Sequence, residues 1–121
     1  MKKPYLLILT AILYLVLTGG MSLANDSDIE REIEELKQAI RINPDDVDAL
    51  GNLGHALIKA GMYKEAIEAC EQVIRINPDV ADAHYNLGVA YGKLGMHIEA
   101  IEAYRQAIRI NPDDTRYRIA N

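Results

Sequence analysis

The sequence predicts an all-α protein built from stacked helix-turn-helix repeats. The tripeptide Ile-Asn-Pro occurs at residues 42–44, 76–78 and 110–112, so its three copies are evenly spaced. Residues 47–80 and 81–114 align without a gap and share 21 of 34 positions. A fixed period of this size is typical of a repeat solenoid. No stretch alternates apolar and polar residues with period two, so we expect no β-sheet.

Composition agrees with a single helical domain and excludes one class of partner. The chain has 121 residues, is 50% apolar and contains no Trp or Phe, so Leu, Ile, Val, Ala and Met must supply most of the core. After Ala24 the chain carries 11 basic and 18 acidic side chains, a net charge near −7. Such a surface repels phosphate backbones, and we therefore expect no nucleic-acid partner.

Residues 1–24 have the composition of an export signal. Lys2 and Lys3 precede an apolar stretch from Tyr5 to Leu17, and small residues follow at Ser22 and Ala24. This order predicts a secretory signal cleaved after Ala24, with Gly19-Gly20 ending its helix. The alternative is a retained membrane anchor, because the uncharged run from Pro4 to Asn25 is long enough to cross a bilayer as a helix. Either way we expect the remainder outside the cytoplasm, periplasmic, secreted or anchored.

Helical periodicity and helix-ending residues divide the remainder into five predicted helices. Apolar residues recur three or four apart in each, and Pro44, Pro78 and Pro112 stop the helices that precede them. The predicted helices are 28–42, 47–60, 63–76, 81–94 and 97–110. The domain organisation is therefore a half repeat at 28–46, full repeats at 47–80 and 81–114, and the start of a capping helix at 115–121.

The residue pattern resembles the tetratricopeptide repeat (TPR) family, whose units are 34-residue helix-turn-helix hairpins. The resemblance rests on two matching sets of residues, which are Leu53-Gly54, Leu57, Gly61, Ala66, Cys70, Val73 and Pro78, and then Leu87-Gly88, Tyr91, Gly95, Ala100, Tyr104, Ala107 and Pro112. It implies an α-α superhelix of two full repeats and a half repeat, with the first helix of each pair lining a concave groove.

Packing can also be anticipated from the pattern. Gly54 and Gly88 should allow close approach of Ala66 and Ala100 where paired helices cross. One core layer is expected from Leu53, Leu57, Ile67, Cys70 and Val73, and the next from Leu87, Tyr91, Ile101, Tyr104 and Ala107. The C-terminal end lacks a complete polar cap, so we expect it to be sticky and open to self-association.

The sequence contains no pattern that indicates an enzyme, a cofactor or a metal. His55, His84 and His97 lack zinc-ligand spacing, and no nucleophile motif or Gly-rich phosphate loop is present. Cys70 lies on the inner stripe of its helix and is expected to be a buried apolar residue. We therefore expect no catalytic residues, no cofactor and no metal site.

The candidate binding residues lie on the first helix of each pair. Their three- and four-residue spacing places them on one face, outside the apolar stripe. They are Asp48, Asn52, His55 and Lys59 in the first repeat, and Asp82, Tyr85, Asn86, Val89 and Lys93 in the second. The family resemblance implies that asparagines in such a groove hold the backbone of an extended peptide. An equally simple interpretation is that duplication copied solvated residues.

These observations favour an exported, non-enzymatic adaptor or assembly factor that binds a protein or an extended peptide. Two alternatives stay open. The chain could be a structural piece that stacks through its uncapped end, or a scaffold held at the membrane by its first segment. The sequence does not identify the partner.

Overall fold

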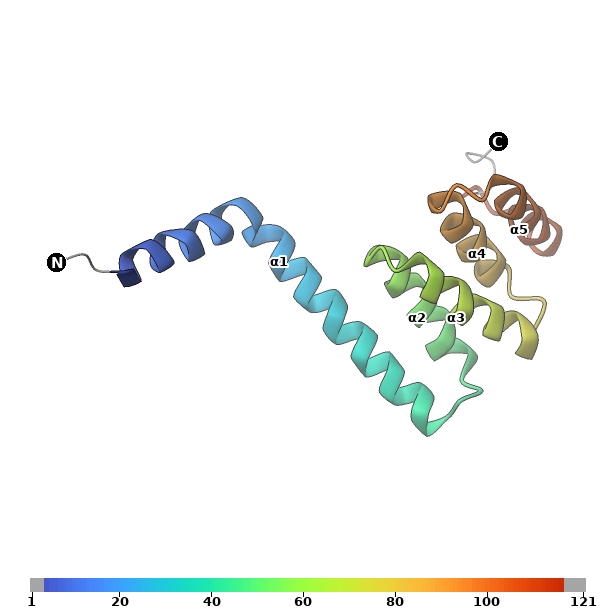
Figure 1. The fold of residues 1–121 in the computed structure, drawn as a ribbon. Helices are drawn as coiled ribbons and strands as arrows, with labels where there is room; N and C mark the ends of the chain where they lie inside the picture. Colours follow the sequence, from blue (N-terminus) through green and yellow to red (C-terminus); the bar gives the residue numbers. More distant parts are fainter. Residues whose placement is uncertain (1–3, 117–121) are drawn as a thin grey trace.

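The computed structural model of the protein describes residues 4–116, which form five α-helices and, in that range, no β-strand. In chain order they are α1 (Pro4–Ile42), α2 (Val47–Lys59), α3 (Tyr63–Ile76), α4 (Ala81–Lys93) and α5 (His97–Ile110). Helices α2 with α3 and α4 with α5 form two antiparallel pairs, and α3 and α2 also contact α4 (Figure 1). The prediction of an all-helical repeat solenoid is confirmed.

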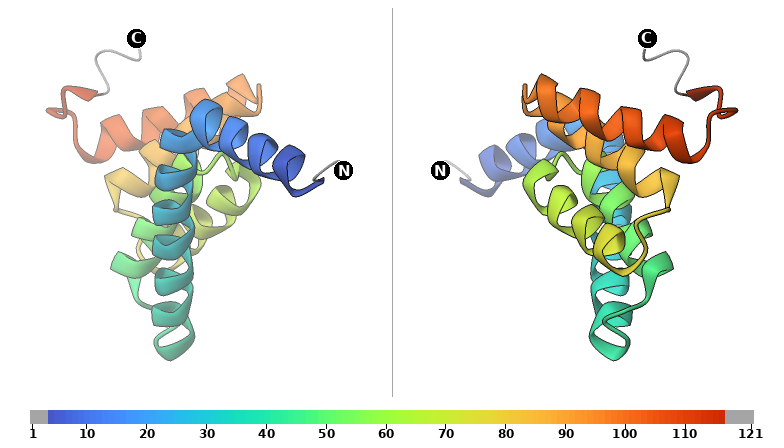
Figure 2. Two further views of the ribbon diagram at one scale, coloured as in Figure 1. Left: turned by 90° about the vertical axis from the view of Figure 1, so that its left-hand side faces the viewer. Right: turned by 90° about the vertical axis from the view of Figure 1, so that its right-hand side faces the viewer.

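The first helix is longer than predicted. One continuous helix, α1, spans 39 residues, so the predicted break at Gly19-Gly20 and the predicted start at residue 28 are both wrong. Each glycine costs a helix about 1 kcal/mol relative to alanine, but it keeps the backbone donor that proline lacks, so two glycines need not stop the helix. Figures 1 and 2 show that the N-terminal part of α1 projects away from the helix pairs.

The signal and anchor predictions concern this same segment. Residues 1–3, which include Lys2 and Lys3, lie outside the described residues. Among the described residues, no helix is both long and apolar enough for a membrane span.

The bounds of the other four helices agree with the capping and turn residues of the sequence. Helix α3 and helix α5 have the predicted bounds, and α2 and α4 each end one residue earlier than predicted. The Asp46 carboxylate caps α2 by accepting a hydrogen bond from the Ala49 amide at 3.0 Å. The turns within the pairs use Gly61 and Gly95 at φ of 76° and 77°, which only glycine adopts without strain.

The main core is enclosed by four helices, which are α1, the pair α2 and α3, and α4. The main cluster joins residues of α1, α2, α3 and α4, which are Ile33, Leu53, Ala56, Leu57, Ala66, Ala69 and Ala90. Ile33 makes α1 part of this core, and its burial explains why the helix packs on α2. Of the predicted first layer, Leu53, Leu57, Cys70 and Val73 are buried, whereas Ile67 is only half-buried.

The predicted second layer is mostly not buried. Ala107 is fully buried, but Leu87, Tyr91 and Tyr104 are half-buried and Ile101 is 51% exposed. The helical periodicity identified the correct helix face, but within residues 4–116 no helix packs on the outer side of α5. Ile101 is therefore an exposed apolar residue on the C-terminal face, and self-association through that face stays a prediction.

The predicted close approach of Ala66 is found at Gly54, where a methyl group would lie 3.8 Å from the Ala66 carbonyl oxygen, whereas the neighbours of Gly88 differ from the prediction. A methyl group at Gly54 would lie 3.0 Å from the Cys70 sulfur, and one at Gly88 would lie 2.7 Å from the Tyr104 ring. Ala100 is not among the nearest atoms at Gly88. The glycines thus make room chiefly for the side chain at the Cys70 and Tyr104 position, which is the same position in the two repeats.

Candidate functional site

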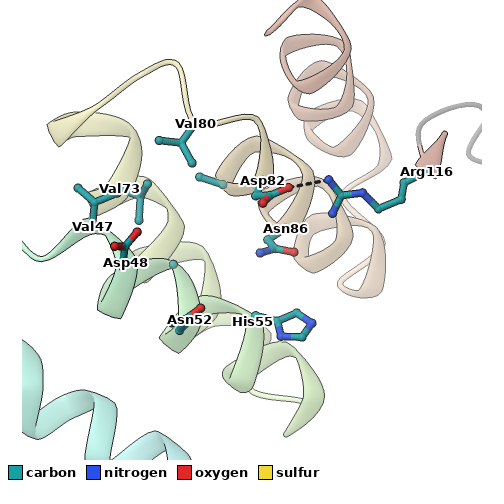
Figure 3. Close-up of a pocket in the computed structure, with 11 residues that line it drawn as sticks. Val47, Asp48, Asn52, His55, Val73, Val80, Asp82, Asn86 and Arg116 are labelled. Carbon is teal, nitrogen blue, oxygen red and sulfur yellow. Dashed lines mark hydrogen bonds and ion pairs between the residues drawn. The ribbon is translucent and has the colours of Figure 1, made fainter. Parts of the chain in front are cut away.

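A pocket of about 350 Å³ lies between the first helices of the two repeats, α2 and α4. We call it the α2/α4 pocket, and Figure 3 shows its lining. Its polar lining residues are Asp48, Asn52, His55, Asp82, Asn86 and Arg116. Its apolar lining comes from Val47, Val73, Val80 and Ala83.

Five of the nine predicted groove residues line this pocket. From α2 these are Asp48, Asn52 and His55, and from α4 they are Asp82 and Asn86. One helical turn separates successive members, so each helix presents them along one side. The pocket therefore places the two asparagines of successive repeats in a single cavity.

The other four predicted residues do not line the pocket. The ammonium group of Lys59 lies 3.5 Å from the Glu32 carboxylate of α1. This ion pair holds the Lys59 side chain toward α1 and away from the pocket. Lys93 is exposed at the end of α4, and Val89 is half-buried. Tyr85 is half-buried, and its ring centroid lies 5.8 Å from that of Tyr104 in α5.

The polar pair Asp82 and Arg116 closes one end of the pocket. An Arg116 guanidinium nitrogen donates to the Asp82 carboxylate at 2.6 Å (Figure 3). The guanidinium also lies 4.9 Å from the centre of the Tyr85 ring. Arg116 also donates to the Asp114 carboxylate. These hydrogen bonds, first with Asp114 and then with Asp82, raise the pKa of Arg116, and the same contact lowers the pKa of Asp114.

Arg116 was absent from the predicted site, although the sequence contained a signal for it. Adding the repeat length of 34 to Asp48 gives Asp82, and adding it again gives Arg116. The three residues thus occupy one position in successive repeats. The third copy replaces a carboxylate by a guanidinium, and this change allows the ion pair with Asp82.

The described part of the chain contains no group of three or more His, Cys, Asp or Glu side chains arranged to hold a metal ion. Cys70 is 1% exposed, and burial, with a smaller effect of Glu71, raises its pKa to about 12. A thiol with this pKa stays protonated and unreactive near neutral pH. His84 is buried, and its Nε2 lies 2.8 Å from the Pro78 carbonyl oxygen, a structural contact at the repeat boundary.

Comparison with solved structures found several similar proteins. MamA is 36% identical over 70% of this chain and 50% of its own, with a TM-score of 0.68. YrrB, described as a TPR protein with an unusual peptide-binding site, is 31% identical over 84% of this chain and 52% of its own, with a TM-score of 0.74. The TPR domain of Arabidopsis OM64 has a TM-score of 0.75 at 18% identity, covers 85% of each chain and shows the fold alone. The chain thus spans about half the length of MamA and YrrB.

Family comparison points in the same direction. No match was found among curated proteins. Two family models described as tetratricopeptide repeat match residues 35–68 and 81–114, and a third, described as TPR repeat, matches residues 54–95. Together with the helix-pair architecture, these matches identify the chain as a tetratricopeptide repeat protein over residues 35–114.

Proposed function

We propose that this chain is an exported, non-enzymatic interaction module that binds an extended stretch of another polypeptide in the α2/α4 pocket. The observation that carries the proposal is the convergence of Asn52 and Asn86 on that pocket from two successive repeats. An amide side chain supplies one acceptor and two donor hydrogens, which complement the carbonyl and amide groups of any backbone. Binding of this kind selects for an extended conformation more than for a particular sequence.

The two amides are available for this role. Asn52 is exposed and Asn86 is half-buried, and within residues 4–116 neither side chain has a hydrogen bond to another residue. A ligand that pairs with them would therefore not need to displace an internal contact. Asp48 and Asp82 make the pocket favourable for a donor-rich or basic guest, and the Arg116 contact offsets part of that charge.

Similarity to other proteins supports binding of a polypeptide. The description of YrrB names a peptide-binding site, and that protein resembles this chain over 84% of the chain. Stacked helix pairs create the extended surfaces that repeat proteins use for partners, and the two pairs of this chain pack on each other in that way.

Export is proposed from residues 1–24. In the projecting part of α1, the described apolar side chains of Tyr5, Leu6, Leu7, Ile8, Leu9 and Leu13 are all exposed, Leu7 at 75%. These side chains contribute nothing to the repeat core, which favours a targeting role. Cell fractionation tests export, since recovery of the protein from the cytoplasm alone contradicts it. Mass measurement of the exported protein then distinguishes a cleaved signal, which leaves a chain beginning at Asn25, from a retained anchor, which leaves the chain intact.

The pocket proposal is tested with the double variant Asn52→Ala/Asn86→Ala. A partner is first captured from the exported fraction with the full chain, and its binding segment is then titrated. Two amide hydrogen bonds lost at about 0.5–1.5 kcal/mol each should weaken binding by a factor of about five to about 150. Gln38→Ala, which removes an exposed amide from α1, is the matched control and should leave affinity unchanged. Equal affinity of the double variant and the original chain contradicts the pocket proposal.

A second candidate function is self-assembly through the C-terminal face. It is favoured by Ile101, which is 51% exposed, whereas its counterpart Ile67 packs against the main core cluster. Sedimentation over a range of concentrations distinguishes the two functions. A monomer at every concentration contradicts stacking, and an oligomer that Ile101→Lys dissociates supports it.

A further inference from the structure

A second depression lies on the opposite side of α4. It has a volume of about 640 Å³ and runs between α3 and α5, with α4 as its floor. We call it the α3/α5 groove. Leu87 and Tyr91 lie on its floor, and Ile74 and Ile98 flank it from α3 and α5. These side chains make the lining mainly apolar.

The groove is also acidic. Glu71, Glu99 and Glu102 line it, and among the described lining residues Arg75 is the single Lys or Arg, with His84 also present. None of the three carboxylates forms an ion pair with a described residue. The Tyr91 hydroxyl donates to Glu71 at 3.4 Å. The pKa of Tyr91 is raised by burial, then by Glu71 and Glu99, so both carboxylates act on the same point of the groove.

The preceding repeat boundary, where α1 and α3 flank α2, is a reference within the same chain. Subtracting 34 from Glu71 and Glu99 gives Lys37 and Glu65, and these two side chains form an ion pair at 3.8 Å. In the groove the corresponding pair consists of two glutamates. Both glutamates line the same groove, so a cation placed between them would be attracted by both carboxylates.

A second difference between the two boundaries adds apolar surface to the groove. Ile98, which is 82% exposed, occupies the position of Lys64 in the preceding repeat. Across all the lining positions, the earlier boundary carries three cations and two carboxylates, whereas the groove carries one cation and three carboxylates. The floor also changes, since Leu50, Leu53 and Leu57 are buried beneath α1 and α3, while Leu87 and Tyr91 are half-buried.

From these differences we propose that the α3/α5 groove is a second docking site, and that its occupant is an amphipathic helical segment of a partner protein with Lys or Arg beside its apolar face. Aliphatic side chains of the segment contact Ile98, Tyr91 and Leu87, and a basic side chain lies between Glu71 and Glu99. This supplies the cation that Lys37 supplies at the earlier boundary. The mode is a helix in an apolar groove, with charge at the rim setting partner choice.

This site differs from the α2/α4 pocket in both location and chemistry. Asp82 and Asn86 face the pocket, whereas Leu87 and Tyr91 lie roughly half a turn around α4. The pocket offers amides to a backbone, and the groove offers apolar surface and carboxylates to side chains. The two binding sites can therefore be tested independently.

The probe is a fluorescent synthetic peptide of about five helical turns, with leucines on one helical face and lysines on the other. Two control peptides are used, one with glutamate in place of lysine and one with the same residues in an order that disperses the leucines. Fluorescence anisotropy with the full chain measures affinity. We expect the amphipathic basic peptide to bind at least about tenfold more tightly than either control.

The test variant is Glu71→Lys/Ile98→Lys, which gives the groove the residues of the earlier boundary. Its control, Glu35→Lys/Ile42→Lys, makes the same two chemical changes at exposed positions of α1 and so matches the change in net charge. We expect the groove variant to weaken peptide binding about tenfold or more and the control to change it less than about twofold. Glu99→Gln, which keeps shape and removes one charge, should give a smaller loss. Circular dichroism establishes that each variant keeps its helical content.

Four outcomes would overturn the proposal. Equal binding of the dispersed peptide indicates charge attraction without a groove. An equal loss in the α1 control indicates an effect of net charge. Loss of binding in Asn52→Ala/Asn86→Ala places the peptide in the pocket. Self-association that Glu71→Lys/Ile98→Lys abolishes, without peptide binding by the original chain, assigns the groove to a second copy.

Discussion

Replacing Gly88 with alanine should destabilise the fold, although alanine is the better helix former. The added methyl would lie 2.7 and 2.8 Å from the Cε1 and Cδ1 atoms of Tyr104. Carbon atoms prefer separations of about 3.5–4.0 Å, so the ring must move by roughly 0.8 Å or more. The ring cannot move freely, because Tyr85 packs beside it with a centroid distance of 5.8 Å. Overpacking of this kind costs about 1–3 kcal/mol.

Gly92 provides the matched control within the same helix. A methyl there meets no atom within 4 Å, so Gly92→Ala should stabilise the protein by its helix propensity, about 1 kcal/mol. Both substitutions gain that propensity term, so the difference between their unfolding free energies isolates the overpacking cost of about 1–3 kcal/mol. The net effect of Gly88→Ala should then be a loss of about 1 kcal/mol.

Urea unfolding of the full chain, followed by far-ultraviolet circular dichroism, measures both values. A third variant tests the cause, because in a Tyr104→Ala background the clash is absent and Gly88→Ala should become stabilising. The reasoning is refuted if Gly88→Ala is as stable as Gly92→Ala, or if removing the Tyr104 ring leaves the effect of Gly88→Ala unchanged.

Two further predictions concern the first core layer. Leu57 is 2% exposed, so Leu57→Ala should lower the free energy of unfolding in urea by about 2–5 kcal/mol. Ile101 is 51% exposed, so Ile101→Ala should lower it by less than about 1 kcal/mol. Equal losses in the two variants would contradict this difference in burial. The raised pKa of Cys70, about 12, means that the folded protein binds more protons than the unfolded chain above about pH 9, so stability should fall as pH rises through that range. The raised pKa values of Tyr91 and Tyr104 act in the same direction in both proteins, so comparison with Cys70→Ala at pH 8 and 10 isolates the Cys70 loss, about 1 kcal/mol. No difference between the two proteins would contradict it.

The helix bounds could be predicted because local chemistry fixes them. Gly61 and Gly95 supply the positive φ of the turns, and Pro78 removes a donor that a continuing helix requires. The course of α1 could not be predicted in this way, because Gly19-Gly20 weakens a helix without removing a hydrogen bond. The prediction that Ile101 is buried was wrong for another reason. Periodicity identifies the face of a helix, but the burial of that face depends on whether another element packs against it.

The candidate site was predictable within one helix and less so between helices. Spacing placed Asp48 and Asn52 on one side of α2, and the structure brings them into the same pocket as Asn86. Lys59 shares that spacing, but it lies about 16 Å beyond Asp48 along the helix and reaches Glu32 instead. The ion pair of Arg116 with Asp82 depends on the turn after α5, which spacing within a helix cannot describe.

The two proposed binding sites differ in how the repeats of the sequence bear on them. Duplication copies neutral residues along with functional ones, so the recurrence of Asp48 and Asn52 as Asp82 and Asn86 is compatible with inheritance alone. A residue that differs between two copies must have changed after the duplication. Two such residues lie together in the α3/α5 groove. Glu71 in place of Lys37 removes an ion pair, and Ile98 in place of Lys64 exposes apolar surface beside it. Each change costs solubility or stability in the isolated chain, and a basic amphipathic partner would compensate for both. We therefore propose that the groove sets partner specificity and that the pocket holds a polypeptide backbone of any sequence.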